Sequence, residues 1–334
     1  MSKKKIYVAG NMVVDILYPV TGLPKPGELT SIQDGISRST GGAVCNVIGD
    51  LALMDTSLPL AALGRVGTDT EGDYVLATLG AYKNVDLSMI KREGKTAFTA
   101  VMADSISKER TFFHYRGANA RFCEDDIDWG KIDEGFLHIG YVLLLDALDG
   151  EDPEYGTKMA RLLHHAQERG IQTSLDVVSE AGGRFKRLVP PSLKYTDYCI
   201  INEIEAGQVT GIPLRDEAGN LIVPKVPRAL EEIKKLGVSQ WAVIHCPEGG
   251  YGLDDRGRFA ESPAVNVPPD YIKGKVGAGD AFCAGTIYAA SQGGSLEEGI
   301  ELGNAAAAAS LSMPGATEGM LPLEELRKLR ERFN

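Results

Sequence analysis

Gly277-Ala278-Gly279-Asp280-Ala281-Phe282-Cys283-Ala284-Gly285 is the most informative string in this 334-residue chain. Two glycines let the backbone turn tightly and approach a ligand, and a helical pattern follows at once. The free N–H groups and positive end of such a helix form an anion site, suited to charge developing on a phosphoryl group in transfer. Asp280 would lie beside that site and accept a proton from an attacking hydroxyl. Taken alone, the string fits equally well a Gly-rich turn followed by an ordinary acidic residue in the first helical turn.

Outward from this string, apolar β-branched runs alternate with helical patterns. Strands are predicted at 6–14, 58–66, 98–103, 111–115, 136–145, 171–178, 198–201 and 241–246. Helices are predicted at 43–54, 73–81, 153–169, 203–209, 228–236, 281–290, 296–312 and 323–333. This alternation predicts an α/β fold built on a mostly parallel sheet with helices on both faces.

Two segments interrupt the alternation. Residues 15–40 are rich in Gly, Pro, Ser and Thr, and residues 98–115 contain two strand patterns with no helix between them. Both are expected to be antiparallel pieces that project from the main sheet and together form a small β-sheet, a candidate lid. The predicted organisation is a large α/β domain (1–14, 41–97 and 118–334) and a small β lid (15–40 and 98–117).

Composition excludes several classes of protein. Hydrophobic residues make up 43% and charged residues 24% of the chain, which is typical of a globular protein with a sizeable core. The net charge of −11 disfavours a nucleic acid or an anionic membrane as partner. No apolar run approaches the roughly 18 residues of a membrane span. The five cysteines are far apart and form no C-x-x-C pair, so neither a zinc site nor a disulfide framework is expected, and a reducing cytoplasm is the expected location.

Two further strings carry polar groups suited to a polyhydroxylated ligand. Gly41 and Gly42 precede a helix that carries Asn46, whose amide can both donate and accept hydrogen bonds. Asp15 follows the first predicted strand, and ligands of open α/β sheets bind outside the carboxyl ends of strands. An incidental Asn and a surface Asp explain these strings about as well.

Asn202-Glu203-Ile204-Glu205 follows the predicted strand at 198–201. Asn at a helix cap with Glu three residues later is a capping box, which gives a purely structural explanation. The functional alternative has Asn202 facing a phosphate and Glu205 holding water on a magnesium ion. The string alone favours the cap.

The remaining motifs are mostly negative. No histidine has a Ser, Cys or metal-ligand partner at a meaningful spacing, so all five are interpreted as packing residues. There is no G-x-x-x-x-G-K-[ST] string, and the first strand does not end in G-x-G-x-x-G. A P-loop is therefore excluded, and a nicotinamide-binding fold is disfavoured.

Taken together and in order, these strings resemble the ribokinase-like (PfkB) family of carbohydrate kinases over essentially the whole chain. The matching strings are Asp15 after the first strand, Gly41-Gly42 with Asn46, residues 64–72, Arg116-Gly117-Ala118-Asn119-Ala120, Asn202 with Glu205, Gly277 to Phe282, residues 303–307, residues 314–316 and residues 321–322. The resemblance implies a large α/β domain, a small β lid over the substrate, and transfer of the γ-phosphoryl group of ATP to a hydroxyl.

The resemblance also implies residue roles. Asp280 would be the base, and the backbone amides of Gly277, Ala278 and Gly279 would form the anion hole. The expected substrate-binding residues are Asp15, Gly41, Gly42, Asn46, Arg116 and Asn119. The expected nucleotide-binding residues are Asn202, Glu205, Gly250 and Asn304, with Mg²⁺ held by Glu205 through water.

The sequence departs from the family pattern in three places. Gly274 and Lys275 stand where many members have Asp-Thr, and that Asp commonly belongs to a monovalent-cation site. Pro247 replaces the usual Gly of the nucleotide loop, which predicts altered nucleotide binding. The segment 176–180 reads Asp-Val-Val-Ser-Glu, where sugar kinases often carry Asp-x-Asn-x-Arg, so it does not point to a familiar sugar.

An ATP-dependent sugar kinase is therefore the leading hypothesis. A nucleoside kinase shares the fold and base and is favoured if lid aromatics (Phe112, Phe113 and Tyr115) stack on a base. A non-catalytic sugar-binding sensor is the alternative from another class, and the intact Asp280 argues against it. The lid is also expected to form a homodimer, because Phe98, Phe112, Val101 and Tyr115 give it more apolar area than one ligand can cover.

Overall fold

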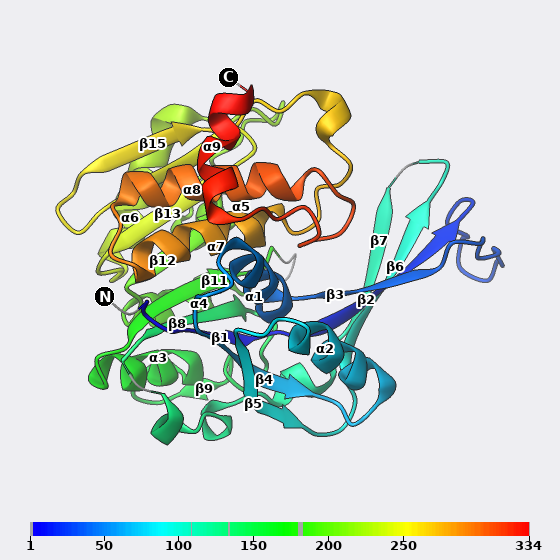
Figure 1. The fold of residues 1–334 in the computed structure, drawn as a ribbon, viewed down its shortest axis with the longest axis horizontal. Coiled ribbons are helices and arrows are strands. Elements are labelled where there is room, and N and C mark those ends of the chain that lie inside the picture. Colours follow the sequence, from blue (N-terminus) through cyan, green and yellow to red (C-terminus); the bar gives the residue numbers. More distant parts are fainter. Residues whose placement is uncertain (1–2, 108, 133, 180–182, 334) are drawn as a thin grey trace.

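A nine-stranded sheet runs through the larger part of the molecule in the computed structural model (Figure 1), which describes residues 3–107, 109–132, 134–179 and 183–333. The strand order is β15-β14-β13-β12-β11-β8-β1-β4-β5. The strands from β13 to β5 are parallel, and β14 and β15 are antiparallel additions at one edge. Their bounds are β1 Ile6–Gly10, β4 Leu60–Val66, β5 Val85–Arg92, β8 Phe136–Val142, β11 Gln172–Val177, β12 Tyr198–Asn202, β13 Trp241–Cys246, β14 Gly249–Leu253 and β15 Phe259–Pro263.

Helices cover both faces of this sheet, as the sequence predicts. Alternate residues of β1 point to opposite cores: Ile6 and Val8 pack into one, Tyr7 and Ala9 into the other. The first core lies under α1 Ala43–Met54, α2 Thr70–Gly80, α7 Ala278–Ser291, α8 Leu296–Ser310 and α9 Leu323–Phe333. The second lies under α3 Lys158–Glu168, α4 Phe185–Leu193, α5 Glu203–Thr210 and α6 Val226–Lys235. Short elements are β9 Glu151–Asp152, β10 Gly156–Thr157 and 3₁₀ turns at Gly117–Arg121, Glu124–Asp126, Trp129–Lys131, Val223–Lys225 and Pro269–Tyr271.

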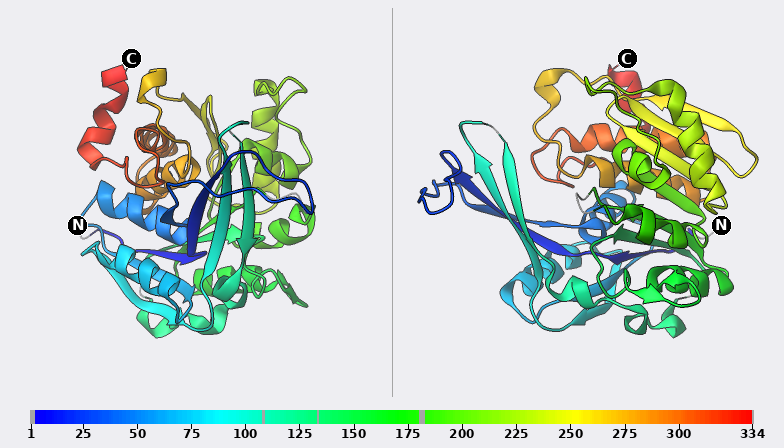
Figure 2. Two further views of the ribbon diagram at one scale, coloured as in Figure 1. Left: turned by 90° about the vertical axis from the view of Figure 1, so that its right-hand side faces the viewer. Right: turned by 180° about the vertical axis from the view of Figure 1, so that it is seen from behind.

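A separate four-stranded sheet projects from one side of the molecule (Figure 2). Its order is β3-β2-β6-β7, and its bounds are β2 Val13–Val20, β3 Ser37–Gly41, β6 Ala97–Asp104 and β7 Arg110–Tyr115. The expectation that two distant segments form one small sheet is confirmed. Its pairing is not antiparallel throughout, because β2 and β6, which join the two segments, run parallel.

Two predicted elements are wrong in extent. The strand predicted at 6–14 is two strands, because β1 ends at Gly10 with φ 127° and the chain then leaves for the small sheet as β2. The helix predicted at 153–169 begins only at Lys158, since the preceding residues form the β9–β10 hairpin and Thr157 caps the helix. The sequence predicted short strands within residues 15–40 without bounds, where β2 and β3 lie, and it missed β5, β14, β15 and α4.

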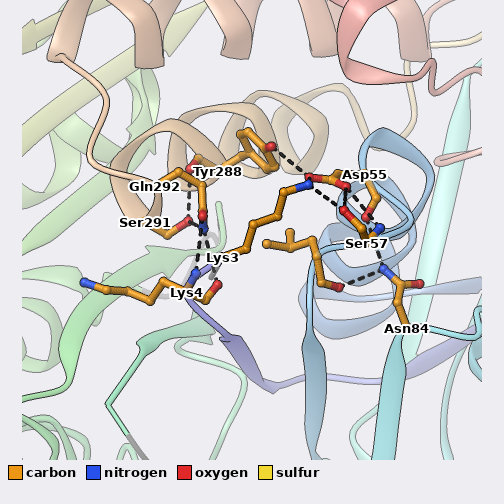
Figure 3. A network of polar contacts seen from close by, with 9 residues as sticks. Lys3, Lys4, Asp55, Ser57, Asn84, Tyr288, Ser291 and Gln292 are labelled. Carbon is orange, nitrogen blue, oxygen red and sulfur yellow. Dashed lines mark hydrogen bonds and ion pairs between the residues drawn. The ribbon is translucent and has the colours of Figure 1, made fainter. Parts of the chain in front are cut away.

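The start of the chain is fixed at the amino end of β1 (Figure 3). Lys3 Nζ pairs with the Asp55 carboxylate and donates to Ser57 Oγ at 2.6 Å, and the Tyr288 hydroxyl donates to Asp55 Oδ2 at 2.8 Å. The Lys4 backbone exchanges two hydrogen bonds with the Gln292 amide. These contacts join the N-terminal segment to the ends of α1 and α7. Among the described residues, no helix has the length and apolar character needed to cross a membrane.

Candidate active site

The polar groups singled out in the sequence gather where the parallel strands end and α7 begins. Gly277 caps α7 in the left-handed conformation, with φ 79°. A Cβ at this position would come within 2.6 Å of the Ala316 Cβ, so both the conformation and the space require glycine. The first-turn N–H groups of α7 have no acceptor within the helix and point toward this end of the sheet. A glycine-capped helix start is the local geometry that the predicted anion site requires.

Asp280 lies in the first turn of α7 and is 8% exposed. Its carboxylate accepts hydrogen bonds from Asn46 Nδ2 at 2.8 Å and from the Tyr141 hydroxyl at 2.6 Å. Burial raises the pKa of Asp280, and the two hydrogen bonds act in the opposite direction. Asp280 is thus a buried carboxylate held in a fixed orientation by two donors.

Asn46 reaches Asp280 because of how α1 begins. Gly42 precedes the helix with φ 83°, and a Cβ there would come within 2.6 Å of the Asn11 carbonyl oxygen. This close approach places the start of α1 against the turn between β1 and β2. The helix packs against α7, and Asn46 lies one turn after Gly42. The pairing of Asn46 with Asp280 joins segments 234 residues apart.

Asp15 lies on β2, beside Thr99 on β6 in the register of the small sheet. A hydrogen bond from Thr99 lowers the pKa of Asp15, but burial, which is the larger effect, and the nearby charge of Asp280 raise it. Thr99 Oγ1 in turn lies 3.1 Å from His114 Nδ1. The small sheet therefore brings a carboxylate, a hydroxyl and an imidazole to the face that adjoins Asp280.

Asn202 and Glu205 form the capping box that the sequence predicts. The side-chain Oδ1 of Asn202 accepts from the N–H groups of Ile204 and Glu205, and Glu205 Oε2 accepts from the Asn202 backbone N–H at 3.0 Å. Ser179 Oγ donates to Glu205 Oε1 at 2.9 Å and accepts from Asn202 Nδ2 at 3.2 Å. The cap is confirmed, and it leaves Glu205 almost fully buried at the carboxyl end of β12.

A second buried carboxylate lies next to Glu205. Asp176, near the end of β11, accepts a hydrogen bond from the Val177 N–H at 2.7 Å. Burial raises the pKa of both carboxyl groups, and the charges of Glu205 and Asp280 raise that of Asp176 further. Three buried acids thus share one end of the sheet. Glu180, which completes the sequence string noted above, lies outside the described residues.

Two predicted substrate residues engage the protein itself. Asn119 is fully buried; its Nδ2 donates to the Met12 carbonyl at 3.0 Å and its Oδ1 accepts from the Met12 N–H at 3.3 Å. Arg116 pairs with Asp146 and donates to the Leu143 carbonyl at 3.2 Å. Asn119 therefore fixes the turn between β1 and β2, and Arg116 is held against the segment that follows β8.

Two predicted nucleotide residues contribute to packing at the antiparallel edge of the large sheet. Gly250 lies on β14, where a Cβ would come within 2.8 Å of the Phe282 ring, so glycine allows α7 and α8 to pack on the strand. Asn304 Nδ2, on α8, donates to the carbonyls of Ser262 at 2.9 Å and Pro263 at 3.3 Å on β15. Both residues hold the antiparallel edge of the sheet against α8.

The sequence reading missed several groups at this site. Tyr141 and Thr99 were read only as strand residues, and Asp176 only as a departure from a pattern. Asn11 is fully buried; its Oδ1 accepts from the Tyr141 N–H at 2.7 Å, and its Nδ2 has no partner among the described residues. Asn11 follows the glycine that ends β1, which was the one available signal for it.

A buried, oriented acid at the amino end of a glycine-capped helix, facing a polar small sheet, is the arrangement of a phosphotransferase with an alcohol acceptor. The chain matches the pfkB family carbohydrate kinase description over residues 3–323, and it belongs to that family. It is 25% identical over 333 residues to a ribokinase of Arabidopsis thaliana, covering 97% of this chain and 80% of the relative. It is 26% identical to an ATP-dependent ribose-1-phosphate kinase of Halopiger xanaduensis, covering 99% of each. The solved structure of Arabidopsis thaliana ribokinase complexed with ribose and ATP superposes with a TM-score of 0.79 at 21% identity, over 98% of this chain and 99% of that one.

Proposed function

We propose that this protein transfers the γ-phosphoryl group of ATP to a hydroxyl of a sugar or sugar-like small molecule, with Asp280 as the general base. The observation that carries the proposal is the position of Asp280: buried, held by Asn46 and Tyr141, and in the first turn of a helix whose N–H groups are free. Phosphoryl transfer depends on positioning and on stabilisation of charge more than on covalent chemistry by the protein.

Each part of the site has a role in this reaction. Asp280 would accept the proton of the attacking hydroxyl, and its two donors keep the accepting oxygen in place. The backbone N–H groups at Gly277, Ala278 and Gly279 would stabilise charge on the transferring group. Asp15, with Gly41, Gly42 and Asn46, would bind the other hydroxyls. The segments 15–40 and 98–117 would act as the lid over the substrate.

The acidic groups near β11 and β12 fit Mg²⁺. Glu205 and Asp176 are buried carboxylates with raised pKa values and no cation beside them among the described residues, and carboxylate and water oxygens are the ligands that Mg²⁺ prefers. Glu205 would hold the ion through water, while Asn202 faces a phosphate. When bound, Mg²⁺ would neutralise charge on the phosphates.

The nucleotide would lie along the wall that Gly250 and Asn304 support. In the loop that precedes β14, Glu248 follows Pro247 and forms an ion pair with Arg215. Arg215 also pairs with Glu203 at 2.8 Å. These ion pairs tie the loop between β13 and β14 to the first turn of α5. Pro247 therefore lies in a loop that is fixed by ion pairs, and rates with ATP, GTP and other triphosphates measure its effect on nucleotide preference.

A nucleoside is the second candidate substrate, because the small sheet places one aromatic ring on the appropriate face. Phe112 lies opposite Val101, on the same face as Thr99 and Asp15, and it is largely exposed. Phe113 and Tyr115 lie on the other face. A purine or pyrimidine ring could stack on Phe112, whereas a sugar alone would leave it uncovered.

The deciding experiment is an ADP-release screen over pentoses, hexoses, a pentose 1-phosphate and nucleosides. A sugar kinase gives turnover on one sugar with kcat/KM in the range of metabolic enzymes, about 10⁴ M⁻¹s⁻¹ or more. Binding of a sugar, seen by calorimetry, with no ADP release from any compound would favour the sensor. Phe112→Ala distinguishes the first two candidates, since it should raise KM strongly for a nucleoside and little for a sugar.

Asp280→Asn tests the base. Asn is isosteric: its Oδ1 can still accept from Asn46 Nδ2, and its Nδ2 can donate to the Tyr141 hydroxyl, which then accepts instead of donating, so we expect the fold and substrate affinity to persist. The proton acceptor is lost, and kcat should fall by about 10²–10⁴-fold. A variant within about threefold of the wild-type kcat would remove Asp280 from this role.

We further propose that the protein works in a reducing cytoplasm. All five cysteines are free, and three of them are buried in the cores. Equal activity with and without a reducing agent over short assays, together with recovery in the soluble fraction of the native host, would support this location.

A further inference from the structure

A second polar cluster lies below the candidate active site, between the sheet and α7. His138 on β8, Asp176 on β11 and Cys283 on α7 each offer a ligand atom, and these atoms all lie within 4.8 Å of one another. All three side chains are buried. Among the described residues this is the only group of three or more His, Cys, Asp or Glu side chains so arranged. Its members are far apart in sequence, so their spacing gave no sign of it.

The fold explains why these side chains converge. Ser174 and Asp176 are two residues apart on β11 and therefore point to the same face, and Ser174 is the register partner of His138. On α7, Cys283 is three residues after Asp280, so both point toward the sheet. The cluster therefore lies next to the candidate active site, one turn of α7 further into the protein.

The distances suit a tetrahedral metal ion. His138 Nε2 and Cys283 Sγ are 3.7 Å apart. Zn²⁺, with bonds of about 2.0 Å to nitrogen and 2.3 Å to sulfur, separates two tetrahedral ligands by about 3.5 Å. The existing gap therefore needs almost no change. A nitrogen, a sulfur and an oxygen ligand with one position left open is also the kind of donor set that Zn²⁺ takes.

Hydrogen bonds from neighbouring groups hold the side chains of the cluster in orientations suited to metal binding. The other ring nitrogen of His138, Nδ1, lies 3.0 Å from Ser174 Oγ, which directs Nε2 toward the cluster. The Val177 N–H donates to Asp176 Oδ1 and leaves Oδ2 available. Burial keeps the imidazole neutral, with a pKa of about 3, so a nitrogen lone pair is available for coordination.

We propose that His138, Asp176 and Cys283 form a binding site for one Zn²⁺ ion per chain, below the candidate catalytic base. Binding forms Zn–N, Zn–O and Zn–S bonds, and the thiol proton of Cys283 leaves to solvent. The fourth position takes a water molecule. The ion brings two positive charges and the Cys283 thiolate offsets one of them, so the net gain beside the carboxylates of Asp176, Glu205 and Asp280 is one positive charge, which relieves their mutual repulsion.

Co²⁺ substitution tests the site without reference to phosphoryl transfer, so failure of this proposal is distinguishable from failure of the proposed function. Titration of the thiol-reduced full-length protein with Co²⁺ should give a near-ultraviolet thiolate-to-cobalt absorption that saturates at one ion per chain and disappears when Zn²⁺ is added. Cys283→Ala should lose this absorption. Cys199→Ala, which removes a buried thiol on the opposite face of the sheet, should keep it.

Thermal unfolding gives an independent readout. We expect equimolar Zn²⁺ to raise Tm by several degrees in the wild type and in Cys199→Ala, and to leave Cys283→Ala unchanged; the melting curve also shows whether each variant is folded. Metal uptake without the thiolate absorption would assign the ion to surface imidazoles such as His164 and His165 and would overturn the proposal. Absorption that persists in Cys283→Ala, or no Co²⁺ binding at all, would overturn it as well.

Discussion

Gly274 has no room for a side chain. A Cβ there would lie 2.8 Å from the Met313 carbonyl oxygen and 2.9 Å from the Pro314 Cα, both in the loop after α8. We therefore expect no stimulation of activity by K⁺ over Na⁺ at fixed ionic strength. Gly274→Asp should not create such a dependence, because the new side chain would displace that loop. Saturable K⁺ activation of the wild type would show that other ligands maintain a cation site.

Asp50 is the most unusual single residue in the core. It is fully buried one turn after Asn46, and neither carboxylate oxygen has a hydrogen-bond partner among the described residues. Burial, followed by the charge of Asp280, raises its pKa well above the ordinary value. The folded protein therefore holds a proton that the unfolded chain releases above about pH 4, so this residue lowers stability as the pH rises from there toward its folded pKa.

Asp50→Asn tests this effect, because Asn resembles the protonated acid. The variant should gain about 1–3 kcal/mol in unfolding free energy over the wild type at pH 7.5 and almost nothing at pH 4. Urea unfolding at the two pH values measures the difference. A variant that is destabilised equally at both would show that an ordered water or ion satisfies the Asp50 carboxylate.

The sequence predicted the site residues whose conformation depends on near neighbours in the chain. The Asn202–Glu205 cap and the glycine before Asp280 depend on neighbours three or four residues away. Tyr141 could not be found in this way, because its hydroxyl meets Asp280 only through the packing of β8 against α7. Nothing in the local sequence distinguishes it from other strand tyrosines.

At the scale of elements, the end of α1 is tied to the first and last parts of the chain through Asp55. Burial alone would raise the pKa of Asp55, but hydrogen bonds from Lys3, Tyr288 and Ser57 outweigh it and lower the pKa to about 2 (Figure 3). A lowered pKa stabilises the fold above the unfolded value of about 3.9, and this stabilisation is lost as the pH falls toward 2.

Asp55→Asn should therefore cost about 1–3 kcal/mol at pH 7, and the difference from the wild type should shrink between pH 4 and 2. Tyr288→Phe removes only one donor and is expected to cost less. Chemical denaturation across this pH range measures both. A penalty for Asp55→Asn that does not change with pH would mean that the charge of Asp55 contributes nothing.

The helices and strands with a regular pattern of apolar residues were predictable. The ones that were missed have sequences without such a pattern. β5 (VDLSMIKR) is an edge strand with mostly half-buried or exposed side chains, and β14 (GGYGL) is rich in glycine. α4 contains Pro190 and Pro191, which usually argue against a helix. The break after Gly10 was missed because apolar residues continue on both sides of it, into two different sheets.

For the molecule as a whole, the order of the motifs predicted the family and the two sheets. It did not predict which residues that are distant in sequence are in contact. The register of the small sheet divides the apolar residues that the sequence grouped together. Val101 and Phe112 lie on the face with Asp15, and Phe98 and Tyr115 lie on the other face, with their rings 5.4 Å apart. The His138, Asp176 and Cys283 cluster was hidden for the same reason, since sequence spacing gives no information about such pairings.

The face of the small sheet away from Asp15 carries the prediction of a homodimer. On this face α2 packs against β2 and β3, where Arg38 stacks on the Tyr74 ring. On β7, Phe113 is still 58% and Tyr115 45% exposed, in a sheet that projects from the large domain (Figure 2). A second copy of the same sheet would bury these rings, and large aromatic side chains dominate the energetics of such contacts. We expect a dimer by light scattering at micromolar concentration, and a monomer for Phe113→Glu. Phe259→Glu, at an exposed position on β15 of the large sheet, is the matched control and should stay dimeric. A fully active wild-type monomer, or a dimer that persists in Phe113→Glu and dissociates in Phe259→Glu, would contradict pairing through the lid.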